Sequence, residues 1–187
     1  MRSAFRWGFC HAALAVWLAA MSVAVSAEEN LQLFEQEIEA GLLYNFLKYT
    51  NWPAEHNDET RGNMVVCLFG GDPFGGHLQS MAGRTVNQHS IEIRIVNRPE
   101  NMNGCSLLYI DAGRKSDWPQ LAHGLNEKQI LTVGNFDAFA RSGGMIEFTK
   151  IEDRIGVKIN LDAVTAAHLT VQDRLLRLAS LVHASPD

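Results

Sequence analysis

MVVCLF, residues Met64–Phe69, is a run of six apolar residues that leads directly into Gly70-Gly71-Asp72-Pro73. A short apolar run closed by turn residues is typical of a strand buried on both faces of a sheet. Two similar runs follow, SLLYI at Ser106–Ile110 and QILTV at Gln129–Val133. Because such strands occur in parallel sheets with both faces covered by helices, the sequence predicts an α/β fold.

The segments around these strands supply the helices and a fourth strand. Apolar residues recur every three or four positions over residues 31–50, which predicts a helix that Trp52-Pro53 ends. IEIRIV at Ile91–Val96 alternates like a strand with one exposed face. Right-handed crossovers favour an order in which the Ile91 strand is followed by the strands of residues 64–69, 106–110 and 129–133. Short helices are expected at Phe74–Met81 and Trp118–Leu125.

The C-terminal third predicts an antiparallel hairpin and two helices. Met145–Lys150 and Arg154–Ile159 alternate on either side of Glu152-Asp153, so we expect a hairpin that completes one edge of the mostly parallel sheet. Asn160 is a suitable cap for a helix through His168, and Thr170 with Asp173 forms a capping box for a last helix. The buried face of that helix is expected to hold Leu175, Leu178, Ala179 and Val182.

The first 27 residues read as a signal peptide. Arg2 and Arg6 precede an apolar stretch, and Val25-Ser26-Ala27 is a small-x-small cleavage pattern. The alternative is an uncleaved membrane anchor. With cleavage after Ala27, residues 28–187 form a single domain with no further apolar stretch long enough to span a membrane. The protein is then exported.

Charge and cysteine content narrow the function. The 187-residue chain has 16 Lys and Arg against 21 Asp and Glu, a net charge of −5, which argues against binding nucleic acid. Beyond the leader the only cysteines are Cys67 and Cys105. Export places them in an oxidising compartment, so a structural disulfide is expected.

A glycine-rich loop follows the first central strand, at the edge where open α/β sheets bind ligands. Gly70, Gly71, Asp72 and Gly75 are therefore candidate ligand-binding residues. The loop matches neither nucleotide-binding glycine motif, and Pro73 lacks a donor N–H. The alternative is a glycine-rich turn in which Asp72 caps the next helix.

The sequence contains no recognisable catalytic site. The histidines beyond the leader lack the spacing of metal ligands, no nucleophile motif occurs, and Cys67 lies within an apolar strand. We therefore expect no catalytic residue, no metal site and no cofactor. A protein-binding regulator is favoured, and a small-ligand-binding sensory protein is the alternative.

Several short segments, taken in their order and spacing, form a recognisable pattern. They are Tyr44-Asn45-Phe46 with Lys48 and Trp52-Pro53, Val66-Cys67-Leu68-Phe69-Gly70 with Asp72-Pro73-Phe74-Gly75, Ile130-Leu131-Thr132-Val133, Gly143-Gly144-Met145-Ile146-Glu147-Phe148, Arg154-Ile155-Gly156-Val157-Lys158-Ile159-Asn160 and Leu175-Leu176-Arg177-Leu178-Ala179. The segment that opens at Tyr44 and the segments from Gly143 to Asn160 are the most distinctive. With this pattern the chain resembles the YfiR-like family of bacterial periplasmic proteins.

The resemblance implies a function by binding. The best-known member restrains an inner-membrane diguanylate cyclase through the cyclase's periplasmic sensor domain, which lowers cyclic di-GMP and opposes biofilm formation. An outer-membrane lipoprotein can sequester that repressor. The second cysteine pair of some members is absent here, so only the Cys67–Cys105 bridge carries over. Gly70-Gly71-Asp72 lacks the Glu-Phe of a GGDEF cyclase, so the chain is not itself a cyclase.

The edge hairpin is the expected partner surface. An edge strand offers backbone groups to a partner strand, and Gly143-Gly144 would permit close approach. Strand alternation makes Glu147, Arg154 and Lys158 candidate exposed contacts. The alternative is that these charges only keep the edge soluble.

Overall fold

The computed structural model describes residues 31–53, 62–125, 128–151 and 154–183. The predicted leader, residues 54–61 and the predicted turn at Glu152-Asp153 lie outside these ranges. The chain divides into two compact units, Met1–Glu35 and Gln36–Asp187. Of the first unit only residues 31–35 are described, and they are helical. The remaining paragraphs concern the second unit.

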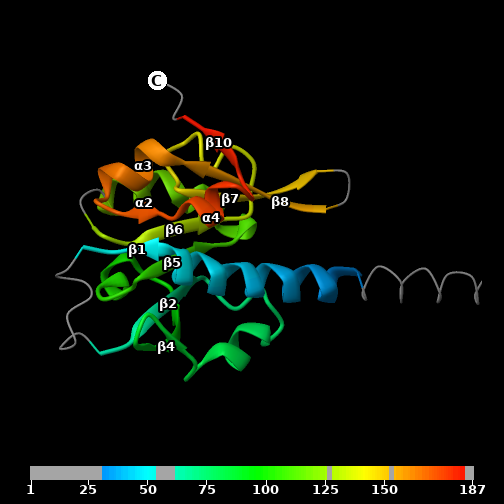
Figure 1. The fold of residues 1–187 in the computed structure, drawn as a ribbon, viewed down its shortest axis with the longest axis vertical. Helices are drawn as coiled ribbons and strands as arrows, with labels where there is room; N and C mark the ends of the chain where they lie inside the picture. The colour runs from blue at the N-terminus through cyan, green and yellow to red at the C-terminus, as the bar shows by residue number, and fades with distance from the viewer. Residues whose placement is uncertain (1–30, 54–61, 126–127, 152–153, 184–187) are drawn as a thin grey trace, which may run out of the picture. The chain divides into compact units, whose positions relative to one another are not determined.

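An eight-stranded, mostly parallel sheet forms the centre of this unit, which confirms the predicted fold class. Its strand order is β10-β8-β7-β6-β5-β2-β4-β3 (Figure 1). The strands are β2 (Met64–Phe69), β3 (Thr85–Val86), β4 (His89–Val96), β5 (Leu107–Ile110), β6 (Leu131–Gly134), β7 (Ile146–Ile151), β8 (Arg154–Asn160) and β10 (Ser180–Val182). The predicted order of the four central strands, β4-β2-β5-β6, is confirmed. A two-stranded sheet joins β1 (Thr50–Asn51) to β9 (Thr170–Val171).

The helical segments are short apart from the first. Residues 36–49 are helical, as the apolar spacing predicts. The others are α2 (Trp118–Leu125), α3 (Leu161–Ala166), α4 (Asp173–Leu176) and the 3-10 segments η3 (His77–Met81), η4 (Pro99–Met102) and η5 (Ala112–Asp117). The side chain of Asn160 accepts a 3.0 Å hydrogen bond from the Ala163 amide and caps α3, as expected.

Two hydrophobic cores lie on opposite faces of the sheet, and β2 contributes to both. Val66 and Leu68 join a core that includes Ala40 and Phe46 of the first helix. Cys67 and Phe69 join a second core with Trp118 and Leu121 of α2, Phe136 and Phe139. Alternate residues of one apolar strand therefore hold helices on both faces, as the MVVCLF run predicts.

The C-terminal segment differs from the prediction. Thr170 belongs to β9 rather than to a capping box, and α4 ends at Leu176. Residues 180–182 then form β10, which pairs in parallel with β8. Leu178, predicted to be buried, is 68% exposed. Parallel pairing with β8 outweighs the helical spacing of the apolar residues here.

Tyr109 is a buried residue of the core that contains Val66, Leu68 and Phe46, and it offers a test of the packing there. Its ring packs on Phe74 with a centroid distance of 4.7 Å, and its hydroxyl is buried without a hydrogen-bond partner in the described chain. Burial, together with the negative charges of Glu39 and Asp111, raises the pKa of the Tyr109 phenol above its ordinary value.

We expect Tyr109→Phe to leave stability unchanged or to raise it by about 1 kcal/mol, because the ring remains and an unpaired polar group is removed. Chemical denaturation of the wild type, this variant and the half-buried control Tyr44→Phe measures the effect. A loss of more than about 1 kcal/mol at Tyr109 alone would mean that its hydroxyl is hydrogen-bonded after all.

Candidate functional site

The β7–β8 hairpin has the antiparallel register expected from its sequence, from Ile146↔Ile159 to Ile151↔Arg154. It is not the outermost element, however, because β10 pairs with Lys158–Asn160. No strand of the described chain pairs with the outer edge of β8 from Arg154 to Val157. This end of the hairpin projects from the rest of the unit (Figure 1). An unpaired edge therefore exists, but only in the distal half of the hairpin.

The three predicted contact residues share one face of the hairpin, but they differ in exposure. Glu147 pairs with Lys158 in the register. Toward the hairpin tip, Arg154 lies on the same face because it is four residues before Lys158 on β8. Arg154 is exposed, whereas Glu147 is 1% exposed, so the prediction that Glu147 is accessible is wrong. The loop that precedes β7 folds over Glu147, and the Ala140 amide donates to Glu147 Oε2 at 3.0 Å.

Glu147 is the centre of a buried polar network. Lys158 Nζ donates to Glu147 Oε1 at 2.7 Å, and the Lys158 side chain is 32% exposed. Asn160 Nδ2 donates to the Ala140 carbonyl at 2.7 Å, while Asn160 also caps α3. The network ties β7, β8, the loop at Ala140 and α3 together. Lys158 thus supports the fold, which leaves Arg154 and the 54% exposed Ile151 as the accessible side chains nearest the hairpin tip.

The glycines expected to admit a partner strand have another role. Gly144 is buried, and a side chain there would collide with the ring of Phe139. Gly143 has φ +92°, a conformation that L side chains rarely adopt. This pair of glycines therefore shapes the loop around Phe139.

The candidate ligand loop lies at the carboxyl end of β2, as predicted, and the Arg114 side chain lies against its first glycine. A Cβ on Gly70 would lie 2.9 Å from Arg114 Cγ, and the Arg114 guanidinium stacks 4.7 Å from the centre of the Phe69 ring. Asp72 Oδ1 accepts a 2.8 Å hydrogen bond from the Phe74 amide, so it closes the turn. A ligand over Gly70 would have to displace Arg114.

Gly71 and Gly75, the other glycines of this loop, also have positive φ angles. No side chain approaches the Cβ position of Gly71, whereas Gln36 Oε1 lies 3.0 Å from that of Gly75. The turn therefore requires glycine at both positions, and binding of a ligand by this loop stays a prediction.

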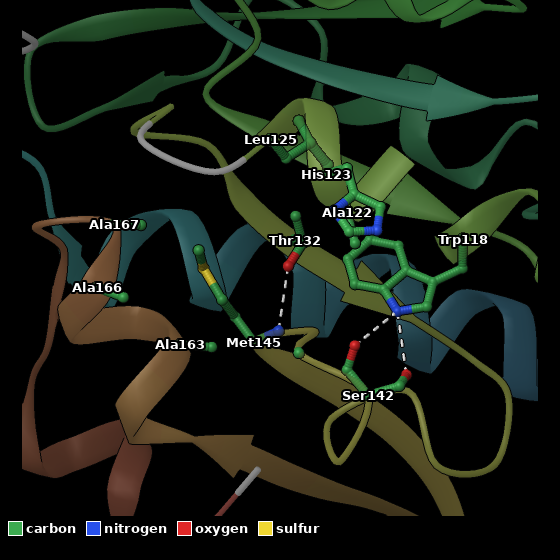
Figure 2. A pocket seen from close by; sticks show the side chains of 11 residues that line it. Trp118, Ala122, His123, Leu125, Thr132, Ser142, Met145, Ala163, Ala166 and Ala167 are labelled. Carbon is green, nitrogen blue, oxygen red and sulfur yellow. Dashed lines mark hydrogen bonds between the residues drawn. The ribbon is translucent and has the colours of Figure 1, made fainter. Parts of the chain in front are cut away.

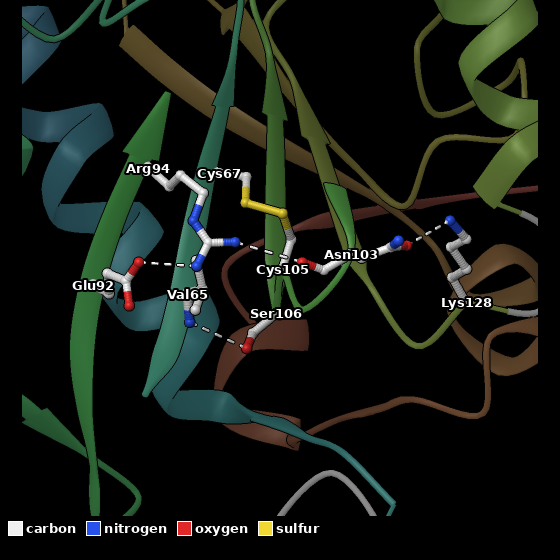
Figure 3. The surroundings of a disulfide bond; sticks show 8 residues. All are labelled: Val65, Cys67, Glu92, Arg94, Asn103, Cys105, Ser106 and Lys128. Atoms are coloured by element: carbon white, nitrogen blue, oxygen red, sulfur yellow. Dashed lines mark hydrogen bonds and ion pairs between the residues drawn. A yellow bond between two sulfur atoms is a disulfide. The ribbon is translucent and has the colours of Figure 1, made fainter. Parts of the chain in front are cut away.

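Cys67 and Cys105 form the predicted disulfide, with their Cα atoms 5.8 Å apart (Figure 3). Both are buried. Cys105 precedes β5, and its amide donates to the Met102 carbonyl at 3.1 Å. Gly104, with φ +81°, turns the chain so that Cys105 reaches the middle of β2.

Polar side chains surround the disulfide and hold its loop (Figure 3). Arg94 Nη2 donates to Glu92 Oε1 at 2.9 Å, and Lys128 Nζ donates to Asn103 Oδ1 at 3.3 Å. Hydrogen bonds from Arg94 and Asn63 hold the pKa of Glu92 below its ordinary value. The loop before β5 is thus tied both to the bridge and to its neighbours.

Two features of the β7–β8 hairpin region are not predicted by the sequence analysis. The first is β10, because its apolar residues also fit a helix. The second is the Glu147 network, because its members come from two strands and a loop that meet only in the folded chain. A single Glu within Met145-Ile146-Glu147-Phe148 was the available signal, since a charge in an apolar strand needs a partner.

No cluster of three potential metal ligands occurs in the described ranges.

Residues 36–180 match the profile of the YfiR/HmsC-like family. The chain belongs to the YfiR/HmsC-like family. The match covers the first helix of the second unit, the central strands, the disulfide and the hairpin. No helix in the described part of this YfiR/HmsC-like chain is long and apolar enough to span a membrane.

No curated protein matches the chain. A solved structure, the ABC domain in complex with L-Trp from Streptococcus pneumonia, is 9% identical with a TM-score of 0.47. The alignment covers 66% of this chain and 56% of that one. A similarity this low carries no argument about function.

Proposed function

We propose that the protein is a non-enzymatic periplasmic regulator that binds the periplasmic sensor domain of an inner-membrane signalling protein. The partner we favour is a GGDEF diguanylate cyclase, which the protein would restrain to lower cyclic di-GMP and oppose biofilm formation. An outer-membrane lipoprotein would release the cyclase by sequestering the protein. The family match over residues 36–180 is the observation that carries this proposal.

The distal half of the hairpin is the surface we assign to the partner. The unpaired edge of β8 from Arg154 to Val157 supports β-strand addition, in which backbone hydrogen bonds supply affinity. Exposed Ile151 adds apolar area, and Arg154 adds a positive charge that favours an acidic partner surface. Periplasmic export with cleavage after Ala27 is part of the same proposal.

Site-specific photo-crosslinking in the native host tests the proposal. A photoreactive amino acid at Arg154 should capture a membrane protein with a periplasmic sensor domain, whereas the same probe at exposed Arg84 should not. Arg84 precedes β3, the strand at the opposite end of the sheet order. Equal capture from both positions, or none from Arg154, would contradict the proposed surface.

Charge reversal at Arg154 gives a quantitative prediction. Arg154→Glu should weaken binding to the purified sensor domain about tenfold, because an exposed charge at the interface becomes repulsive. Stability should change by less than about 0.5 kcal/mol, since Arg154 is exposed. Calorimetric titration of the sensor domain with wild type, Arg154→Glu and the matched control Arg84→Glu measures the three affinities. A loss of the same size in the control would indicate a general charge effect.

A further inference from the structure

A pocket of about 390 Å³ lies between α2 and α3, away from the glycine-rich loop (Figure 2). Trp118 and Ala122 line it from α2, Ala163 and Ala166 line it from α3, and Thr132 and Met145 lie between them. The volume falls within the range of roughly 300–1,000 Å³ that is usual for small-molecule sites. The pocket is therefore large enough for a ligand of several rings or a short chain.

The lining is largely apolar and carries no formal charge. Trp118 and Met145 are buried, while alanines on both helices leave the space open. None of the lining residues is Lys, Arg, Asp or Glu, and His123 lies at the exposed rim. Because a charged ligand would lose its hydration without a compensating ion pair, this lining favours an uncharged molecule.

Thr132 supplies one buried polar group in this lining. The residue is 3% exposed, and its Oγ1 accepts a 3.1 Å hydrogen bond from the Met145 amide. Its hydroxyl hydrogen has no acceptor among the described residues. The indole N–H of Trp118, by contrast, already donates to the Ser142 carbonyl at 3.1 Å and to Ser142 Oγ at 3.0 Å. Thr132 thus has a donor left for a ligand, and Trp118 has none.

Contacts within the protein hold the lining side chains in place before a ligand binds. The bonds to Ser142 and the packing of Trp118 on Phe139, with ring centres 4.4 Å apart, hold the indole in place. The Thr132–Met145 bond holds the chain just before β7. A ligand would therefore bind without the cost of first ordering these groups.

We propose that this pocket binds a small, uncharged, mostly apolar molecule that carries an acceptor oxygen, such as a carbonyl, ester or ether. The apolar body packs against Trp118 and Met145, and the oxygen accepts a hydrogen bond from the Thr132 hydroxyl. The site needs no partner protein, so it stands or fails independently of the proposed regulatory role.

Prodan, a neutral naphthyl ketone whose fluorescence reports an apolar environment, is a suitable probe. The exported protein should give saturable, blue-shifted prodan fluorescence. Ala166→Trp, a substitution at the exposed rim, should fill the pocket and weaken binding at least about tenfold. Ala82→Trp, at an exposed alanine outside the pocket, is the matched control and should leave affinity unchanged.

Two substitutions at Thr132 test the hydrogen bond without adding bulk. Thr132→Ser keeps the hydroxyl and should bind prodan like the wild type, whereas Thr132→Val should bind roughly three- to tenfold more weakly. Circular dichroism verifies that each variant is folded. Absence of saturable binding to the wild type, or equal affinities of Ala166→Trp and Ala82→Trp, would overturn the proposal. Equal affinities of the two Thr132 variants would overturn the assigned hydrogen bond.

Discussion

Removing the disulfide with Cys67→Ala and Cys105→Ala together is expected to lower the free energy of unfolding by about 4 kcal/mol. The two cysteines are 38 residues apart, so the bridge restricts a long loop of the unfolded chain. Both residues are buried in the second core, and we expect the melting temperature to fall by roughly 10 °C. Thermal and chemical denaturation of the purified protein and of the double variant measure the loss.

Partner binding distinguishes a structural bridge from a redox switch. With a structural bridge, the double variant should bind the sensor domain normally at temperatures where it remains folded. Reduced wild-type protein is the matched control, because it has the same open bridge without substitution. Stability within about 1 kcal/mol of the wild type, combined with loss of binding, would contradict a structural bridge and favour a redox switch.

Replacing Lys158 with methionine is expected to lower the free energy of unfolding by about 3 kcal/mol, which is at the low end for breaking a buried ion pair. Glu147 is 1% exposed, and among the residues that the structure describes it would keep only the hydrogen bond from the Ala140 amide. The Lys158 side chain is 32% exposed, so removal of its amine costs little by itself. The loss therefore reflects a buried carboxylate left without its cation. Chemical denaturation measures it.

The double variant Glu147→Gln/Lys158→Met supplies the control. Glutamine keeps an acceptor for the Ala140 amide and removes the charge, so the double variant should recover most of the lost stability. Hydrogen exchange should be fast at Ala140 and Ala163 in Lys158→Met and slower in the double variant, since both amides belong to the network. Additive losses from the two substitutions would show that Glu147 and Lys158 do not stabilise each other.

The central sheet could be predicted because its signals are local. Met64–Phe69 has apolar residues at every position, and such a strand is stable only between two covered faces. Together with the right-handed crossover rule, this led to the observed order of the four central strands. The alternation around the hairpin likewise predicted that Glu147, Arg154 and Lys158 share a face.

The remaining features depend on contacts between distant segments. Alternation assigns Glu147 to a face, but only the fold of the loop at Ala140 determines that this face is covered. The apolar residues of 175–182 fit a helix as well as a strand, and pairing with β8 decides between them. The pocket draws its lining from α2, β6, the loop before β7 and α3, so no single stretch of sequence indicates it.

The level of cyclic di-GMP in the native host tests the central proposal most directly. Deleting the gene should raise cyclic di-GMP several-fold, and expression of the wild type or of Arg84→Glu should restore the low level. Arg154→Glu should accumulate to the same amount in the periplasm but fail to restore it. An unchanged level of cyclic di-GMP after deletion, measured under conditions where the protein is abundant, would contradict the proposed regulation of a diguanylate cyclase.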